Sequence, residues 1–123
     1  MPQSFTLFVS KSPYDSRNAE SAYAFCVAAL AAGHRIKHIF FYQSGVNNAS
    51  SLLSTNTDEV SMKQNWQSIK QHYNVPLYVC VTAGARRGID IDKQINVADG
   101  FEMVGMSEYF AALHNSAIKS IQF

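Results

Sequence analysis

The most informative stretch of the chain reads Pro76-Leu77-Tyr78-Val79-Cys80-Val81-Thr82-Ala83-Gly84-Ala85-Arg86-Arg87-Gly88. Residues 77–81 are apolar and follow a proline, which is typical of a buried strand. The glycines and arginines that come next end the apolar run. The stretch therefore predicts a strand that ends near Cys80 and delivers a thiol to the edge of a sheet.

On both sides of this stretch, predicted strands and helices alternate along the chain. Strands are expected at 5–10, 36–42, 77–81, 101–104 and 117–122. Helices are expected from a cap at Asn18 to a stop at Gly33, from a cap near Thr57 to residue 72 or 73, and over 107–114 with Ser107 as cap. This order predicts an α/β fold with a mainly parallel sheet in a single domain, residues 1–123.

Two of the expected helices carry an apolar stripe at helical spacing. In the first, the stripe places Cys26 on the inner face, which gives this cysteine a structural role. In the second, Trp66 is expected to anchor the core. The positions are Ala22, Phe25, Cys26, Ala29 and Leu30 in the first helix, and Met62, Trp66, Ile69 and Tyr73 in the second.

The carboxyl ends of the strands are the expected place for a ligand, as in other open α/β sheets. Three loops should meet there: 10–17, 42–48 and 80–88. The first two loops bring polar side chains that could line a pocket around Cys80, namely Ser10, Ser12, Tyr14, Tyr42 and Asn47. A phosphate cradle of the kind found in flavodoxin-like nucleotide-binding modules is an alternative, although loop 10–17 has no glycine and contains Pro13.

Cys80 is the candidate nucleophile at the carboxyl edge of the predicted sheet. Backbone N–H groups and positive charges that follow a strand end can stabilise a thiolate. The candidates for this support are Thr82, Arg86 and Arg87. The competing interpretation is a buried cysteine in a non-catalytic assembly subunit, because free cysteine is among the most buried residue types.

No cofactor or metal is expected. The four histidines, residues 34, 38, 72 and 114, are scattered and are interpreted as surface or helix-end residues. No C-x-x-C pair accompanies them, so the spacing that zinc ligands require is absent. Neither a P-loop nor a Gly-X-Gly pattern is present.

The composition of the chain indicates which kinds of partner it could bind: nucleic acid, a membrane or other protein subunits. The net charge is +1, and no run of Lys and Arg exceeds Arg86-Arg87, so direct binding to nucleic acid is not expected. No apolar segment is long enough for a membrane span or a signal peptide, and we expect a cytoplasmic protein with reduced thiols. Because 47% of residues are hydrophobic and only 15% charged, residues 95–113 and the loop after Tyr42 are predicted to form subunit contacts.

Several segments resemble one known family. These are Cys80-Val-Thr-Ala-Gly-Ala-Arg-Arg-Gly-Ile89, the first strand, Gly33-His34, Gly45-Val-Asn-Asn-Ala49, Asn65-Trp66 and Ile121-Gln-Phe123. Together they resemble the DsrE/TusD family of sulfur-relay proteins, most of all its TusD branch. The resemblance covers nearly the whole chain and is weakest over 90–105.

The resemblance implies a three-layer α/β/α fold with a five-stranded sheet, DsrE-like and of flavodoxin-like architecture. It implies a sulfurtransferase that carries sulfane sulfur as a persulfide on Cys80, for 2-thiolation of the tRNA wobble uridine. It also implies two homologous small subunits in a hetero-oligomer, as a dimer of trimers, with an upstream persulfide donor and a downstream sulfur carrier. A DsrE-type subunit of a dissimilatory sulfur-oxidation complex is the alternative.

Overall fold

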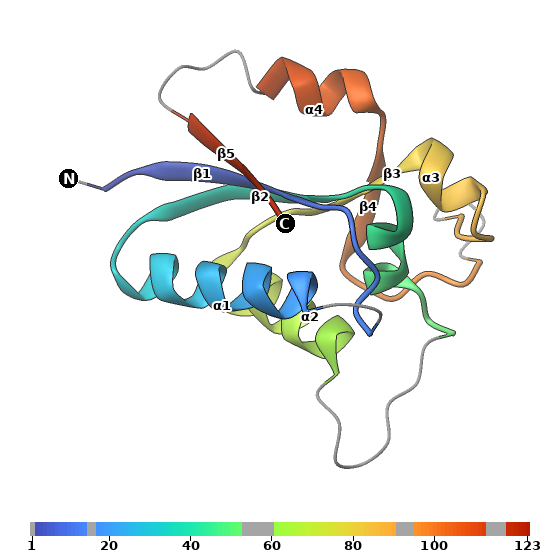
Figure 1. Cartoon of the computed structure of the whole chain (residues 1–123), viewed down its shortest axis with the longest axis horizontal. Helices are drawn as coiled ribbons and strands as arrows, with labels where there is room; N and C mark the ends of the chain where they lie inside the picture. Colours follow the sequence, from blue (N-terminus) through green and yellow to red (C-terminus); the bar gives the residue numbers. More distant parts are fainter. Residues whose placement is uncertain (1, 15–16, 53–60, 91–94, 113–117) are drawn as a thin grey trace.

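Five parallel strands form one sheet in the computed structural model, which describes residues 2–14, 17–52, 61–90, 95–112 and 118–123 (Figure 1). Their order is β4-β3-β2-β1-β5, and every neighbouring pair is parallel. The predicted α/β fold with a five-stranded parallel sheet is confirmed. The strands are β1 (Ser4–Val9), β2 (Arg35–Phe41), β3 (Leu77–Cys80), β4 (Phe101–Val104) and β5 (Ile118–Gln122).

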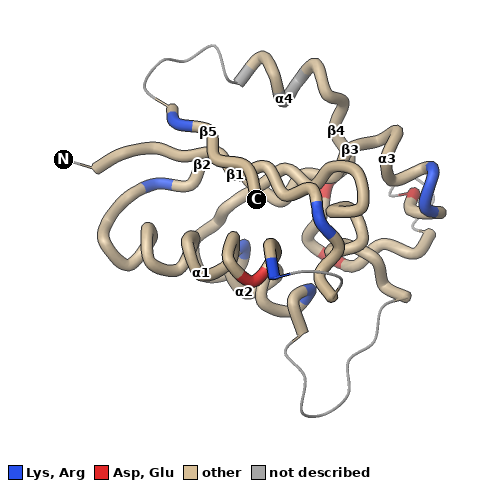
Figure 2. The backbone as a smooth tube through the Cα atoms, in the orientation of Figure 1, with Lys and Arg blue, Asp and Glu red and all other residues tan. Residues whose placement is uncertain are grey.

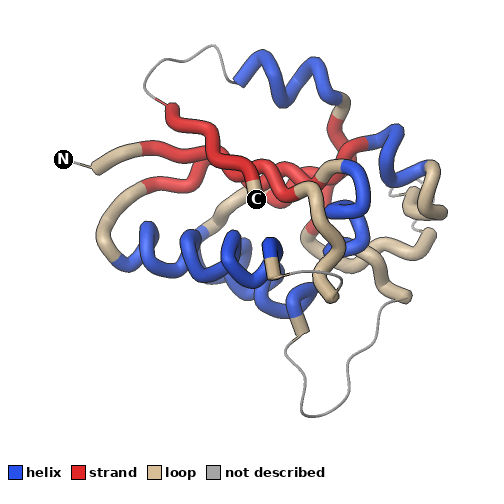
Figure 3. The backbone as a smooth tube through the Cα atoms, viewed as in Figure 1, coloured by secondary structure: helices blue, strands red, loops and turns tan. Residues whose placement is uncertain are grey.

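Helices cover both faces of this sheet and give it three layers. Helices α1 (Asn18–Ala31) and α2 (Met62–Tyr73) lie on one face, and α4 (Met106–Ala112) lies on the other (Figures 1 and 3). Two short helices, the 3₁₀ helix η1 (Gln43–Ala49) and α3 (Val81–Ala85), directly follow the carboxyl ends of β2 and β3. The expected three-layer α/β/α architecture is therefore present.

The path of the chain opens a crevice between β3 and β4. From β1 to β4 the chain moves one way across the sheet, and it then returns over the opposite face to place β5 beside β1. The connection after β3 runs on the α2 side, where Gln67 Nε2 donates to the main-chain oxygen of Asp99 over 2.8 Å. The connection after β4 enters α4 on the other face. Loops that leave adjacent strands toward opposite faces create the crevice in which α/β proteins bind ligands.

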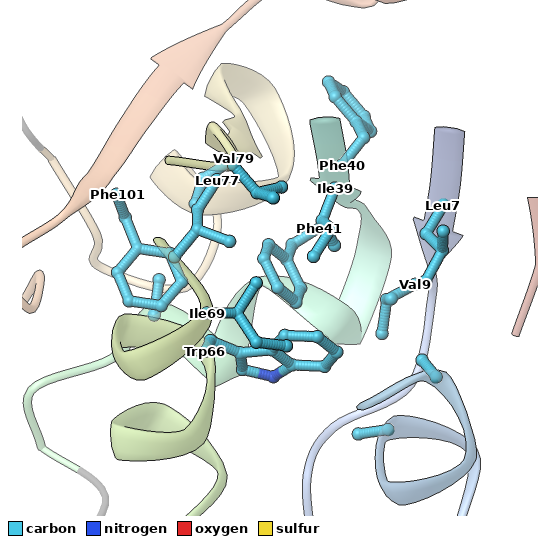
Figure 4. Packing of buried hydrophobic residues seen from close by; sticks show 14 of the residues in the cluster. Leu7, Val9, Ile39, Phe40, Phe41, Trp66, Ile69, Leu77, Val79 and Phe101 are labelled. Carbon is cyan, nitrogen blue, oxygen red and sulfur yellow. The ribbon is translucent and has the colours of Figure 1, made fainter. Parts of the chain in front are cut away.

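The main core lies between the sheet and helices α1 and α2 (Figure 4). Trp66 is fully buried, and its ring packs edge-on against Phe41 with the ring centroids 5.3 Å apart. Phe40 points to the side of β2 opposite Phe41 (Figure 4). Its ring stacks on that of Phe8, with the ring centroids 5.8 Å apart. The prediction that Cys26 and Trp66 belong to the core is confirmed. Tyr73 was wrongly included, because it lies in the last turn of α2 and is 51% exposed.

The helix ends agree with the predictions only in part. Gly33 ends α1 as predicted, with φ of 88°, and the N–H groups of Gly33 and His34 bond back to the carbonyls of Leu30 and Ala29. Two predicted caps are wrong: Asn18 and Met106 are already helical, so neither Asn18 nor Ser107 caps. Helix α2 begins at Met62 after a cap at Ser61. The proposed cap at Thr57 lies outside the described residues. Polar residues at neighbouring positions cap about equally well, so propensity alone does not choose among them.

A buried histidine makes stability depend on pH. His38 lies on β2 against the ring of Tyr78, and burial, with a smaller effect of the Lys37 charge, lowers its pKa below the usual value. The unfolded chain therefore binds the His38 proton more readily than the folded chain. The contribution of neutral His38 to stability is complete above the unfolded pKa, about 6.5, and is lost as the pH falls through that value.

We expect the free energy of unfolding to fall between pH 7.5 and pH 5.5, by up to about 1.4 kcal/mol per pH unit from this one group. Urea unfolding at the two pH values measures this. His38→Phe should remove much of the pH dependence, and His72→Gln, at an exposed position, should retain it. Equal pH dependence in the wild type and His38→Phe would contradict the assignment.

Candidate active site

A cavity of about 600 Å³ opens at the carboxyl edge of the sheet, where the connections after β2, β3 and β4 meet. Cys80 is part of its lining, and so are both arginines that follow it. The cavity thus lies in the crevice that the strand order creates. Its lining residues are Tyr42, Gln43, Ser44, Cys80, Thr82, Ala83, Arg86, Arg87 and Met106.

Cys80 is the last residue of β3 and directly precedes α3. Its backbone is extended, with φ of −63° and ψ of 125°, and the chain turns into the helix at Val81. The residue is only 2% exposed although it lines the cavity. Its small exposed surface therefore belongs to the cavity, whereas the sequence suggested a more open position.

Cys26 offers a contrast within the same chain. It lies in the middle of α1, is fully buried, and does not line the cavity. Burial raises the pKa of the Cys26 thiol to about 12. Because the thiolate is the reactive form of cysteine, Cys26 is inert near neutral pH.

The two arginines of the cavity differ in what they contact. Arg87 Nη1 donates a hydrogen bond of 3.1 Å to the main-chain oxygen of Ala83, one turn back in α3. Arg86 is exposed, and its main-chain N–H donates to the Thr82 oxygen over 3.2 Å, but its guanidinium makes no hydrogen bond or ion pair with another described residue. Among the described residues no carboxylate lines the cavity, so its fixed charge is positive; Figure 2 shows the basic segment at the end of α3.

The polar bowl predicted from the loops is only partly formed around Cys80. Tyr42 and Thr82 line the cavity, as expected, but Ser10, Ser12, Tyr14 and Asn47 do not. Ser10 and Ser12 are buried, and Ser10 Oγ donates to the main-chain oxygen of Phe123 over 3.2 Å. The Tyr14 hydroxyl accepts from the main-chain nitrogen of Met62 over 3.4 Å.

The described side chains of the connection after β1 do not line the cavity because this connection is packed beneath it. Asn48, not its neighbour Asn47, is the buried polar residue of η1. Its Nδ2 donates to the main-chain oxygens of Gly45 (2.8 Å) and Lys11 (3.2 Å), and its Oδ1 accepts from Trp66 Nε1 (3.0 Å). These bonds tie the β1 loop, η1 and α2 together and fix the segment that supplies Gln43 and Ser44 to the cavity.

Four lining residues were missed from the sequence: Gln43, Ser44, Ala83 and Met106. Gln43 and Ser44 directly follow Tyr42, and Met106 follows β4, so all three stand just beyond strand ends. The predicted strand at 101–104 could have placed Met106 at the same edge. Gln43 also has φ of 54°, a left-handed backbone conformation that sequence gives little reason to expect for glutamine.

Two negative observations concern the described part of the chain. No group of three or more His, Cys, Asp or Glu side chains there is arranged to hold a metal ion. None of its helices combines the length and hydropathy needed to cross a membrane.

Comparison with known sequences identifies relatives over most of the chain. Residues 3–123 match the DsrE/DsrF-like family. Sulfurtransferase TusD of Erwinia tasmaniensis is 42% identical over 111 residues, which cover 83% of this chain and 86% of that protein. A Sulfurtransferase TusD homolog of Haemophilus influenzae is 39% identical over 114 residues, covering 86% and 90%.

Solved structures share the fold. The ychN protein from E. coli superposes with a TM-score of 0.81 at 21% identity, covering 98% of this chain and 99% of that one. A protein of unknown function from Methanobacterium thermoautotrophicum gives a TM-score of 0.72 at 11% identity, with the same coverage. At these identities the likeness concerns the architecture.

Proposed function

The chain belongs to the DsrE/DsrF-like family and is a sulfurtransferase, and from this premise we propose that it carries sulfane sulfur as a persulfide on Cys80. The observation that carries the proposal is the place of Cys80: it ends a strand and lines a cavity in which the charged side chains among the described lining residues are two arginines. The other cysteine is excluded because it does not line the cavity and because burial raises its pKa to about 12. Thiolate exchange needs neither a metal nor a general acid.

The transfer consists of two exchanges. In the first, the Cys80 thiolate attacks the terminal sulfur of a donor persulfide, R–S–SH. The donor S–S bond breaks, a new S–S bond forms on Cys80, and the donor leaves as the thiolate R–S⁻. In the second, an acceptor thiolate attacks the terminal sulfur of the Cys80 persulfide, and the Cys80 thiolate leaves. No external oxidant or reductant is consumed, because each exchange makes and breaks one S–S bond.

The test is to incubate the wild-type chain with cysteine persulfide and measure its intact mass. We expect one added sulfur, about 32 Da, located on Cys80 by peptide mapping, and its removal when an acceptor thiol is added. A chain that gains no sulfur, while its Cys80 also resists a small alkylating reagent, would instead be a non-catalytic assembly subunit.

The relay proposed for this sulfur is 2-thiolation of the tRNA wobble uridine, with the chain between an upstream persulfide donor and a downstream sulfur-carrier protein. The relatives named Sulfurtransferase TusD support this direction. The net charge of +1 fits a chain that passes sulfur to another protein and leaves tRNA binding to a later enzyme.

The proposed partners are two homologous small subunits, assembled with this chain as a dimer of trimers. Exposed apolar side chains support such contacts in the region that the sequence indicated: Ile95 is 44% and Phe110 50% exposed. Phe101, in the same region, is instead buried in the core against Phe41. The side chain of Tyr109 lies outside the described residues.

We expect the chain expressed alone to self-associate, because its exposed apolar side chains then remain in contact with water. Co-expression with the two homologous subunits should give a stable complex larger than a heterotrimer, measured by light scattering. Phe110→Glu should weaken the complex, and Lys37→Glu, at an exposed position in the first half of β2, should not. A well-behaved monomer over a wide concentration range would contradict the proposed assembly.

A further inference from the structure

We propose, on the basis of the proposed function, that Arg86 is the anion-binding group of the cavity and holds the terminal sulfur of the Cys80 persulfide as an anion, whereas Arg87 builds the cavity wall. The sequence Arg86-Arg87 gives no reason to distinguish the two residues. The structure does, because the Arg87 side chain makes a hydrogen bond within the chain and the Arg86 side chain does not.

The Arg87 side chain stabilises the end of α3 through a hydrogen bond. Its Nη1 donates to the Ala83 oxygen, one of the carbonyl groups near the end of a five-residue helix. The carbonyls in the last turn of a helix lack partners within the helix, and a cationic side chain there satisfies one of them. Part of the guanidinium of Arg87 is therefore turned back on the chain and away from an incoming ligand.

Arg86 keeps its hydrogen-bonding capacity. It lines the cavity with Cys80 and is exposed, and its guanidinium makes no hydrogen bond or ion pair within the described part of the chain. A guanidinium presents five N–H donors in a fixed fork. None of the described lining residues carries a carboxylate that would repel an anion in the cavity.

The chemistry of the carried sulfur supplies the anion. A hydropersulfide is a stronger acid than the corresponding thiol, so Cys80–S–SH loses its terminal proton to water and becomes Cys80–S–S⁻ near neutral pH. Contact with Arg86 would stabilise this form and orient its terminal sulfur in the cavity. In this role Arg86 contacts the transferred sulfur atom directly.

The test compares two alkylating reagents of similar size on Cys80 of the full chain without sulfur: iodoacetate, which is an anion, and iodoacetamide, which is neutral. Both reagents require the same thiolate, so the ratio of their rate constants reports only the attraction of an anion to the cavity. Arg86→Ala should lower the iodoacetate to iodoacetamide ratio about tenfold, the low end of charge effects in a cleft. Arg86→Lys should restore most of it.

Two comparisons make the result specific. Arg35→Ala removes the same charge at the amino end of β2 and should change the ratio less than about twofold, because salt screens charges more than about 10 Å apart. Arg87→Ala should lower the ratio less than Arg86→Ala and should lower the melting temperature more. An unchanged ratio in Arg86→Ala, or a larger loss in Arg87→Ala, would overturn the assignment.

The failure of this inference is separable from that of the proposed function. The ratio is measured without sulfur transfer, so it tests Arg86 whatever the cargo. If Cys80 gains sulfur but the ratio does not respond to Arg86, only the role of Arg86 is wrong. If Cys80 gains no sulfur from cysteine persulfide, the persulfide role is wrong, and with it the cargo assigned to Arg86.

Discussion

Cys80→Ser is expected to abolish sulfur loading and leave the fold intact. Serine lacks the polarisable thiolate that attacks sulfane sulfur, so the gain of about 32 Da after incubation with a persulfide should disappear. The substitution replaces sulfur by a smaller oxygen at a residue that already lines a polar cavity, so little packing is lost. Intact mass spectrometry measures the loading, and circular dichroism confirms the fold.

Cys26→Ser is the matched control, because it makes the same chemical change in the core. It should load sulfur like the wild type, since the Cys26 thiol is buried and has a pKa of about 12. It should also be less stable, by about 1–3 kcal/mol, because a hydroxyl replaces a thiol in apolar surroundings. Loading that survives in Cys80→Ser and is lost in Cys26→Ser would reverse the assignment of the nucleophile.

Gly45→Ala is expected to cause the largest loss of stability among the glycine-to-alanine substitutions of this chain. A Cβ at Gly45 would lie 2.0 Å from the main-chain oxygen of Val9 and 2.8 Å from its carbonyl carbon. Both atoms belong to the end of β1, where the Val9 oxygen also accepts a bond from the Tyr42 nitrogen. Neither can move without disturbing the sheet, so we expect a loss of about 3 kcal/mol or more in urea unfolding.

Gly105→Ala adds the same methyl group where there is room for it. The nearest atom to a Cβ at Gly105, leaving out its chain neighbours, is Ser107 Oγ at 3.9 Å. Its stability should stay within about 1 kcal/mol of the wild type. If Gly45→Ala were equally mild, the close approach of η1 to β1 would be wrong. So would the account of how η1 places Gln43 and Ser44 in the cavity.

The parts of the fold that sequence predicted well depend on local patterns. The strands at 77–80 and 101–104 and the stop at Gly33 follow from apolar runs, breakers and the conformational freedom of glycine. The order of the strands could not be predicted in this way. It depends on which face of the sheet each connection crosses, and only the packed structure decides that.

In the candidate site, too, local sequence patterns predicted some residues, and tertiary packing decided the others. The strand end at Cys80 and the neighbouring basic pair were visible in the sequence, and they line one cavity with Tyr42 and Thr82. Ser10 and Ser12 carry polar groups at the predicted edge, yet tertiary packing buries both of them. Asn48 was missed in favour of Asn47, because adjacent amides in a short helix differ only in the direction that the fold gives them.

The pairing of β5 with β1 bears on how fast the chain can fold. The hydrogen bond from Ser10 to Phe123 joins residues 113 positions apart, and the whole of β5 pairs in the same way with the first strand. Contacts so distant along the chain form late, because the entropy of a long loop must be lost before they contribute any stability. Until β5 has been synthesised and has paired, the edge of β1 is open to other chains. In this state aggregation competes with folding, and a chaperone that covers the edge would have its largest effect.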